Sequence, residues 1–356
     1  MRILHVIQEL GPGGAEHVVR RLCSASVAGG DAVAVASAGP VLAPPGVVWA
    51  PLPMVGRRPE RVLSASWRLL GFARQWRPDV IHAHNPGMAV VTALTTGRGS
   101  AWPSAVTLHG VPPAADVATA RLLRWAGLPV ITCGEGVAQA LREHGFNPRT
   151  TVNNGVSPPP PAADAAALRV EWGLAPELPL VVAAGRLVAQ KRHDLAVAAA
   201  AHLPSTAWVI VGEGPLRPAL ECQIEALGLS SRVRLAGARP DVRALLGAAD
   251  VVVQPSDWEG LPLVVLEAMS AARPVVASNS RGLRELLHDG VDGHLVPAGD
   301  ARALATGVAG ILGDDDLARR LGDAAAARVE QEFSETAMVG AYQALWRTLA
   351  PRARHR

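Results

Sequence analysis

The chain has 356 residues, of which 49% are hydrophobic and 18% charged. This composition excludes a disordered chain, and the length suits two domains of ordinary size. No apolar run reaches the ~20 residues of a membrane span, and the first ten residues are too short an apolar run for a signal peptide. The three cysteines are far apart and form no C-x-x-C pair, which argues against a disulfide framework or a zinc site. We therefore expect a cytoplasmic protein.

The net charge of +3 is divided unevenly along the chain. Residues 1–155 contain 14 Arg and 8 acidic residues, which gives +6. Residues 156–356 contain 20 basic and 23 acidic residues, which gives −3. This asymmetry indicates that the first half contacts something anionic.

Short runs with strand composition alternate with helical patterns in both halves of the chain. The first half has predicted strands at 2–7, 31–38, 78–85, 104–110 and 129–134, and predicted helices at 13–28, 60–76 and 134–145. The second half has predicted strands at 179–185, 207–212, 233–237, 250–255 and 274–278, and predicted helices at 192–203, 215–227 and 262–272.

Residues 153–169, with four consecutive prolines, form the predicted linker between the halves. The α/β alternation on either side predicts two doubly wound domains facing one another across a cleft. In such sheets, ligands bind outside the carboxyl ends of the strands. The stretches that carry chemistry follow predicted strands, so we expect them at those ends.

A glycine-rich turn follows the first predicted strand, in the stretch GPGGAEHVVRRL. Gly11, Gly13 and Gly14 would allow backbone N–H groups to approach an anion at the start of the next helix. The spacing is not that of a G-x-G-x-x-G dinucleotide motif, so an ordinary tight turn is the alternative.

Lys191 is the only lysine among the 34 basic residues of the chain. A coding bias against lysine could leave one by chance. Lysine is, however, a compact point charge that reaches a phosphate where the planar arginine fork does not fit. Arg186 precedes it by five residues at the end of a predicted strand. Two cations around one such turn can hold a diphosphate, which is the interpretation that we favour.

Two glutamates lie in the stretch QPSDWEGLPLVVLEAMSAARPVV, residues 254–276. Pro262 fits the first turn of a helix, with Glu259 just before that helix and Glu267 within it. Helical rise separates the two carboxylates by roughly 10–12 Å, more than the pair of a retaining glycosidase. They are therefore predicted to hold opposite ends of an extended ligand. A satisfied helix charge is the alternative for Glu267, although its apolar neighbours make an unpartnered carboxylate costly there.

Asp314 and Asp316 form a D-x-D sequence, a pattern that binds a metal ion in some enzymes. They lie where a helix begins, and aspartate at that position caps the helix N-terminus. We favour capping and predict no metal site.

Several histidines are further candidates for chemistry. His82 and His84 point to one side of a predicted strand, and His109 could join them in a metal site. No acidic partner is evident, so we favour histidines that are structural or that contact a substrate. His288 and His294 are predicted to lie in loops.

Taken in order, six stretches resemble the retaining glycosyltransferases of family 4. They are the glycine-rich first turn, TLHG, GRLVAQK, VGEGP, DVVVQPSDWEGLPLVVLEAM and GVDGHLVP. The resemblance spans nearly the whole chain and implies the GT-B fold. It implies an acceptor domain at 1–155, a donor domain at 156–335, and a C-terminal segment, 336–356, whose helix packs back on the first domain.

The resemblance also implies roles on the donor side. Arg186 and Lys191 match the basic pair at the donor diphosphate. Glu267 matches the carboxylate that binds the ribose hydroxyls, and Glu259 matches the glutamate beside the donor sugar. Gly260 and Leu261 would offer backbone amides to sugar or phosphate.

The remaining implied positions are spread over both halves. His109 matches the histidine at the reacting sugar, and Gly13–Gly14 match the loop near the phosphates and the acceptor. The backbone from Gly237 to Arg239 matches the segment that holds the base. The sequence departs from the family pattern at Ala272, where glycine is common.

The activity implied is retaining transfer of a sugar from a UDP- or GDP-sugar to a hydroxyl of a saccharide or lipid-linked saccharide, with no metal, cofactor or nucleic acid. A small secondary metabolite such as an aminocyclitol is the second choice of acceptor. Three other classes stay open: a nucleotide-sugar 2-epimerase, a phosphorylase with a pyridoxal group on Lys191, and a non-catalytic sugar-nucleotide-binding module.

Residues 57–77 carry six arginines and one acid, and they have a helical pattern from about Pro59. The apolar stripe is predicted to comprise Val62, Leu63, Leu69, Leu70, Ala73 and Trp76. An ordinary crossover helix would pack this stripe on its own sheet and leave the arginines solvated. The same helix could also dock on an anionic membrane. A crossover helix and a docking helix are compatible if the apolar stripe faces the sheet while Trp67 and the arginines Arg57, Arg58, Arg61 and Arg68 face lipid headgroups.

Overall fold

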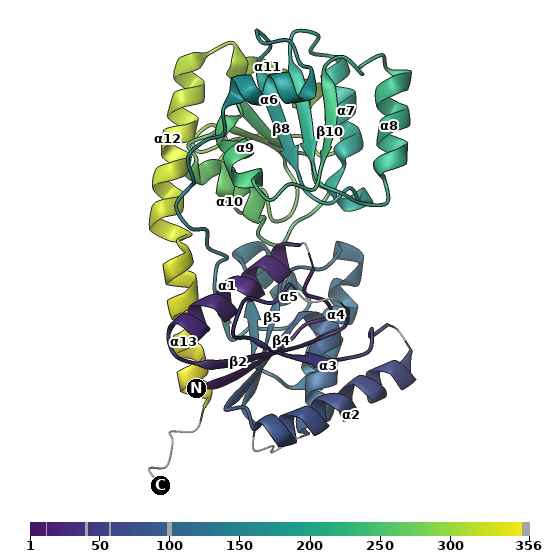
Figure 1. Ribbon diagram of the computed structural model, residues 1–356, viewed down its shortest axis with the longest axis vertical. Coiled ribbons are helices and arrows are strands. Elements are labelled where there is room, and N and C mark those ends of the chain that lie inside the picture. Colours follow the sequence, from purple (N-terminus) through teal and green to yellow (C-terminus); the bar gives the residue numbers. More distant parts are fainter. Residues whose placement is uncertain (12, 40–41, 57, 98–101, 351–356) are drawn as a thin grey trace. The chain divides into compact units, whose positions relative to one another are not determined.

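The computed structural model describes residues 1–11, 13–39, 42–56, 58–97 and 102–350. The chain divides into two compact units, Met1–Asn154 with Thr336–Arg356, and Gly155–Glu335 (Figure 1). Arg57 and residues 351–356, which belong to the predicted membrane-facing and C-terminal segments, lie outside the described residues. Each unit is an α/β structure built on one parallel sheet, as the sequence predicts.

The first unit contains a seven-stranded sheet in the order β3-β2-β1-β4-β5-β6-β7. The strands are β1 Arg2–Val6, β2 Ala32–Ser37, β3 Val48–Pro51, β4 Val80–His84, β5 Ser104–Leu108, β6 Val130–Thr132 and β7 Thr150–Thr151. Strand β1 pairs in parallel with both β2 and β4. From β1 the chain adds β2 and β3 on one side of the sheet and then β4 to β7 on the other. The carboxyl ends of β1 and β4 therefore lie next to each other. The sequence analysis missed β3 and β7, which are short edge strands with too few residues to show a pattern.

The helices of this unit are α1 Gly14–Ala28, α2 Pro59–Trp76, α3 Asn85–Thr96, α4 Asp116–Ala126, α5 Glu135–Glu143 and α13 Glu335–Leu349. The three predicted helices, α1, α2 and α5, are confirmed. The last helix, α13, belongs to the first unit. Its Tyr342 and Trp346 are fully buried, and Tyr342 Oη lies 3.1 Å from Thr107 Oγ1 of β5. Burial of these two aromatic side chains anchors the end of the chain.

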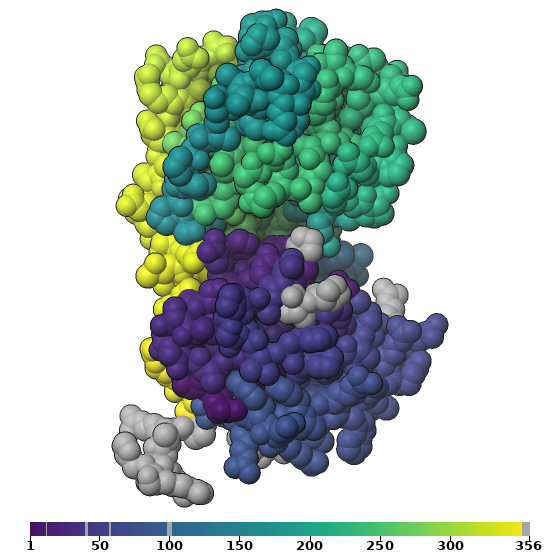
Figure 2. Space-filling model, in the orientation of Figure 1, coloured from purple at the N-terminus to yellow at the C-terminus, as the bar shows by residue number. Residues whose placement is uncertain are grey.

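Helix α2 lies at the surface of the first unit (Figure 2). It buries Ala65, Ser66, Leu69 and Ala73. The predicted stripe is wrong at Leu63, whose side chain is 52% exposed. Leu63 lies two residues from Ala65, about 200° away around a helix of 3.6 residues per turn, so it points away from the buried face.

The second unit contains a six-stranded parallel sheet in the order β10-β9-β8-β11-β12-β13. The strands are β8 Leu180–Ala184, β9 Ala207–Val211, β10 Val233–Gly237, β11 Val251–Gln254, β12 Val275–Ser278 and β13 His294–Val296. Its helices are α6 Ala165–Trp172, α7 His193–Ala201, α8 Arg217–Ala226, α9 Val242–Ala248, α10 Leu263–Ser270, α11 Ala301–Leu312 and α12 Asp315–Glu332. Strands β8 and β11 are wholly buried neighbours at its centre.

Two sequence predictions about this unit are wrong. The predicted linker 153–169 ends early, because α6 begins at Ala165. Asp164 Oδ1 caps it by accepting from the backbone N–H groups of Ala166 at 2.8 Å and Ala167 at 3.2 Å. His294, predicted to lie in a loop, is the first residue of strand β13, which pairs with β12. His288 does lie in a loop.

Candidate active site

In the second unit, the turn after β8 packs on the loop after β11. Asp257 N donates to Gln190 O at 2.9 Å, and Gln190 Nε2 donates to Trp258 O at 2.9 Å. Because β8 and β11 are neighbours in a parallel sheet, their carboxyl ends open at the same edge. The fold thereby brings together two predicted stretches that are far apart in sequence.

Lys191 and Glu259 meet where these two loops pack. Lys191 Nζ donates to Glu259 Oε1 at 2.7 Å, and the two side chains are 14% and 7% exposed. Gln254 Nε2, at the end of β11, donates to the same oxygen at 3.1 Å. The sequence analysis did not identify Gln254. Its amide is a second donor that fixes the Glu259 carboxylate.

Close backbone contacts hold these loops in place. Gly282 has φ +85°, and a Cβ there would overlap with the backbone carbonyl of Glu259. Gly212, with φ +145° in the VGEGP stretch, lies equally close to the carbonyl of Gly185. Any side chain at either position would push a site loop away, so glycine is required at both.

Helix α10 carries the second glutamate. Gly260 is buried and Leu261 partly buried just before Pro262, which occupies the helix N-cap. Glu267 is 8% exposed, and its Oε1 lies 3.7 Å from Arg243 Nε. Arg243 was not predicted from the sequence. Its guanidinium also donates to Ser157 O at 2.6 Å, so the cation beside Glu267 is fixed in position.

The other residues predicted to bind the nucleotide-sugar donor differ in their exposure and contacts. Arg186 is exposed at the end of β8. Gly237, with φ +73°, accepts at its carbonyl from Gly212 N at 2.8 Å. The Arg239 guanidinium binds Asp241 at 2.9 Å and also pairs with Glu171, which raises the Arg239 pKa. Because acidic side chains already hold the Arg239 guanidinium, we expect the backbone of this segment, rather than the Arg239 side chain, to contact the base.

In the first unit, Gly13 is the N-cap of α1, and Gly14 is its first residue. A Cβ on Gly13 would overlap with the carboxylate of Glu16, in the first turn of that helix. Arg20 binds Gly11 O at 2.7 Å. The predicted helix after the glycine-rich stretch is confirmed, and the carboxylate of Glu16 lies beside its N-cap, which the sequence analysis did not consider.

His109 follows β5, and its backbone N–H donates to Asn85 Oδ1 at 3.2 Å. Its Nε2 lies 3.0 Å from His84 Nδ1, so the structure joins two of the predicted histidines. His82 instead contacts Thr107 Oγ1 at 2.8 Å and accepts from Trp346 Nε1 at 3.2 Å. The predicted placement of His82 and His84 on one side of the strand is confirmed, since their rings are 4.5 Å apart.

Comparison with known proteins assigns the family. Residues 12–158 match the model of Glycosyltransferase Family 4, and residues 164–328 match that of Glycosyl transferases group 1. A glycogen synthase of Mycobacterium tuberculosis is 31% identical over 304 residues, which cover 76% of this chain and 70% of that protein. The crystal structure of Anabaena HepE in complex with UDP and glucose superposes with a TM-score of 0.85 at 23% identity, covering 98% of this chain and all of that one. The chain belongs to the GT-B glycosyltransferases.

A shorter match links this glycosyltransferase to the lipopolysaccharide core biosynthesis glycosyltransferase LpsE of Rhizobium meliloti. The two are 35% identical over 166 residues, which cover 47% of this chain and 49% of LpsE. The chain thus spans about half the length of this relative.

Of the remaining candidates in this GT-B glycosyltransferase, the D-x-D sequence is explained by capping. Asp314 Oδ1 accepts from Leu317 N at 2.9 Å at the start of α12, and Asp316 pairs with Arg319 of the same helix. Both interactions are those expected of acids in a first helical turn.

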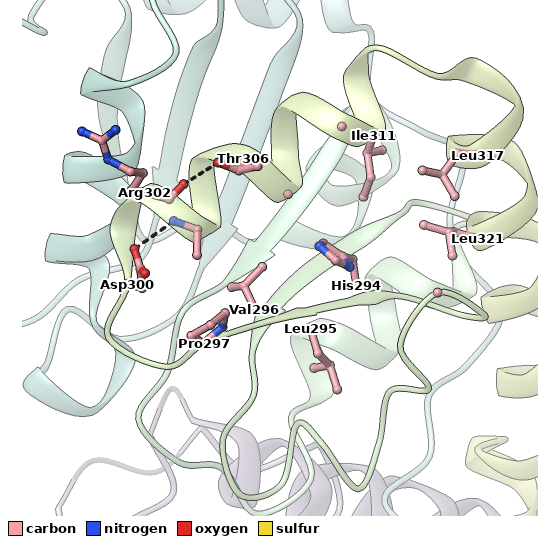
Figure 3. A pocket seen from close by; sticks show the side chains of 14 residues that line it. His294, Leu295, Val296, Pro297, Asp300, Arg302, Thr306, Ile311, Leu317 and Leu321 are labelled. Carbon is pink, nitrogen blue, oxygen red and sulfur yellow. Dashed lines mark hydrogen bonds between the residues drawn. The ribbon is translucent and has the colours of Figure 1, made fainter.

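A pocket of about 620 Å³ lies between β13, α11 and α12 of the second unit (Figure 3). Val296, Ile311 and Leu321 line it together with His294, whose Nδ1 binds Asp289 Oδ1 at 2.9 Å. None of the predicted donor-binding residues is among the lining residues. This pocket is therefore separate from the Lys191–Glu259 site.

Proposed function

We propose that this chain transfers a sugar from a UDP- or GDP-sugar to a hydroxyl of a saccharide or lipid-linked saccharide, with retention at the anomeric carbon. The observation that carries the proposal is the contact of Lys191 with Glu259 at the strand ends of the second unit. The two residues lie in different loops. The family resemblance assigns Lys191 to the donor diphosphate and Glu259 to the donor sugar. Saccharide synthesis is also the subject of the relatives' names.

The leaving group is a nucleoside diphosphate, which needs charge neutralisation as its bond to the sugar breaks. Lys191 and Arg186 supply two positive charges, and the backbone N–H groups of Gly260 and Leu261 precede α10, whose N-terminus favours anions. Glu267 binds the ribose hydroxyls, and the backbone from Gly237 to Arg239 holds the base. These cations take the role that a metal has in other glycosyltransferases, so the reaction needs no metal ion.

In the reaction, the bond from the anomeric carbon to the diphosphate oxygen breaks, and its electron pair stays on that oxygen. The acceptor oxygen then bonds to the oxocarbenium-like carbon from the same face, and its proton passes to the leaving phosphate. Glu259 Oε1 already accepts from Lys191 and Gln254. Two donors on Oε1 fix the carboxylate beside the donor sugar, and the proposed mechanism forms no covalent glycosyl-enzyme.

The acceptor side belongs to the first unit, with His109 at the reacting sugar and Gly13–Gly14 near the phosphates and the acceptor. We further propose that α2 contacts an anionic membrane, which would bring a lipid-linked acceptor to the enzyme. Trp67 is 70% exposed and Leu63 52% exposed on this helix, and Arg61 and Arg68 are exposed beside them. No helix in the described part of the chain is long and apolar enough to cross a membrane.

The test is a panel of UDP- and GDP-sugars, read first by thermal shift and then by release of the nucleoside diphosphate with saccharide acceptors. We expect one donor to raise the melting temperature and to be consumed only with an acceptor, equally with and without excess EDTA. The anomeric coupling constant in the product's NMR spectrum reports retention. Interconversion of the donor sugar without any acceptor would make the protein an epimerase. Binding without turnover would leave a non-catalytic module.

A further inference from the structure

Three histidines in the first unit form a hydrogen-bonded chain at the carboxyl end of its sheet. His5 lies on β1, His84 ends β4, and His109 follows β5. His5 Nδ1 lies 3.1 Å from His84 Nε2, and His84 Nδ1 lies 3.0 Å from His109 Nε2. Within the described residues, the two outer nitrogens, His5 Nε2 and His109 Nδ1, are buried and have no hydrogen-bond partner. The sequence analysis missed His5.

All three rings are neutral near pH 7. Burial lowers the pKa of His5 to about 3 and that of His109 to about 4. The His84 pKa is also well below its usual value, chiefly because of burial. A neutral imidazole carries one N–H, and its other nitrogen can only accept.

Proton counting then allows two arrangements of the chain. Each hydrogen bond needs one N–H and one bare nitrogen. If His84 is protonated on Nδ1, it donates to His109 and accepts from His5, so all three rings carry Nδ1–H. If His84 is protonated on Nε2, all three carry Nε2–H. His109 Nδ1 is thus a donor in the first arrangement and an acceptor in the second.

The neighbouring His82 is held differently. The indole N–H of Trp346 can only donate, so His82 Nδ1 must accept and its proton must lie on Nε2, facing Thr107. This buried histidine on the same strand therefore has one fixed tautomer. It is a natural control for the chain beside it.

A metal ion is the competing explanation, because one ring nitrogen each from His5, His82 and His84 lie within 4.8 Å of one another. Both nitrogens of His82 and both of His84 are already in hydrogen bonds. A bound metal would have to break these contacts, and the described residues offer no fourth His, Cys, Asp or Glu ligand to this group. The hydrogen-bonded chain explains the geometry with the groups present.

We propose that His5, His84 and His109 act as one tautomeric unit in which His84 is a positioning residue for His109. This rests on the proposed function in one respect, the placement of His109 at the reacting sugar. His84 occupies His109 Nε2, so Nδ1 is the ring nitrogen left for the substrate, which has to displace the groups that bury it. Because both arrangements make the same two hydrogen bonds, Nδ1 can accept from or donate to a sugar hydroxyl without a change of charge. The other end of the chain takes the opposite role: the buried His5 Nε2 is bare when His109 Nδ1 donates, and it carries a proton when His109 Nδ1 accepts.

The direct test is ¹⁵N NMR of the histidine rings in the full chain at pH 7.5, labelled with ring-¹⁵N histidine and assigned with single histidine variants. We expect His5, His84 and His109 to show the same tautomer, or the same average of the two, while His82 shows Nε2–H alone. Different tautomers within the trio, a doubly protonated ring, or one equivalent of zinc in the purified protein would overturn the proposal. This readout needs no activity, so it stands apart from the proposed function.

The positioning role is tested with His84→Leu and its matched control His82→Leu, which removes a buried imidazole from the same strand. With UDP-glucose, or the donor that the panel selects, we expect His84→Leu to lower kcat by about 10- to 100-fold with unchanged affinity for the nucleoside diphosphate. His84→Gln, whose amide both donates and accepts, should recover part of this loss. Equal effects of the two leucine variants on kcat would reduce His84 to a structural residue and refute the proposal.

Discussion

Lys191 Nζ and Glu259 Oε1 are 2.7 Å apart, although 68 positions separate the two residues in sequence. Both side chains are largely buried, and each charge neutralises the other. A diphosphate beside Lys191 would share that ammonium with Glu259. The pair therefore links the anion site to the carboxylate that we assign to the donor sugar.

We expect Lys191→Ala to lower turnover by about 10² to 10³-fold, since loss of one contact to a developing oxyanion costs about 3–4 kcal/mol. Lys191→Arg should also be impaired despite its equal charge, because the planar fork does not fit where the compact ammonium reaches Glu259. Steady-state kinetics with the selected donor measures both.

Lys191→Ala also leaves a buried carboxylate without its cation, so each variant is assayed well below its melting temperature. Arg319→Ala is the matched control, because it removes a cation from the exposed pair with Asp316 on α12. Wild-type turnover in Lys191→Arg would show that any cation suffices and that the single lysine carries no special role.

The two glutamates should have separable effects. Glu267→Ala is expected to weaken binding of the free nucleoside diphosphate, because it removes the carboxylate assigned to the ribose and leaves Arg243 unopposed 3.7 Å away. Glu259→Ala is expected mainly to lower kcat. Isothermal titration with UDP or GDP, alongside kinetics, distinguishes the two, and the same loss of nucleotide affinity in both variants would contradict the assignment.

The sequence predicted most of the fold, and it predicted that Lys191 and Glu259 follow strands, because both depend on local patterns. The buried strands β8 and β11 are continuous apolar runs, and the residues after them lie at one sheet edge in any parallel sheet. Arg243 and Gln254 were not predicted, because their roles depend on which side chains the packing of helices and loops places beside a glutamate. His5 was missed for the same reason: one histidine in a strand gives no sign of two others on neighbouring strands.

Ala272 has φ +54°, a left-handed conformation that favours glycine, and it is exposed after the end of α10. This is the position where the sequence departs from the family pattern. We expect Ala272→Gly to raise the free energy of unfolding by about 0.5–1 kcal/mol, because relief of strain exceeds the entropy that glycine adds to the unfolded chain. Ala271→Gly, with φ −87° at the adjacent position, is the control and should destabilise the protein. Urea denaturation measures both, and a lower midpoint for Ala272→Gly would contradict the argument.

The buried histidines should make the protein sensitive to mild acid. Burial lowers the pKa of His5 to about 3 and the pKa values of His109 and His193 to about 4, and it holds those of His82 and His84 well below the usual 6.5. Below pH 6.5 the unfolded chain therefore binds protons that the folded chain does not, and stability falls with falling pH. The loss is about 1.4 kcal/mol per histidine for each pH unit, until the folded-state pKa is reached.

Urea unfolding at pH 7.5, 6.5 and 5.5 measures this effect in a range where most carboxylates stay ionised. We expect most of the decrease below pH 6.5, and a smaller decrease in His82→Leu, which has one titrating group fewer. A free energy of unfolding that is constant from pH 7.5 to 5.5 would mean that these histidines are not held neutral by burial.

The last prediction concerns the exposed face of α2. We expect the protein to sediment with vesicles that contain anionic lipid and not with neutral vesicles, and the bound fraction to fall as salt rises, since each arginine near the surface adds about 1 kcal/mol. Arg61→Glu with Arg68→Glu should abolish binding, and Trp67→Ser should weaken it by removing a side chain that is 70% exposed. Trp125→Ser is the matched control, because Trp125 is 55% exposed on α4 of the same unit. Binding that ignores lipid charge, or that Trp125→Ser reduces as much as Trp67→Ser, would exclude α2 as the docking surface. No binding at all would favour a soluble saccharide as the acceptor.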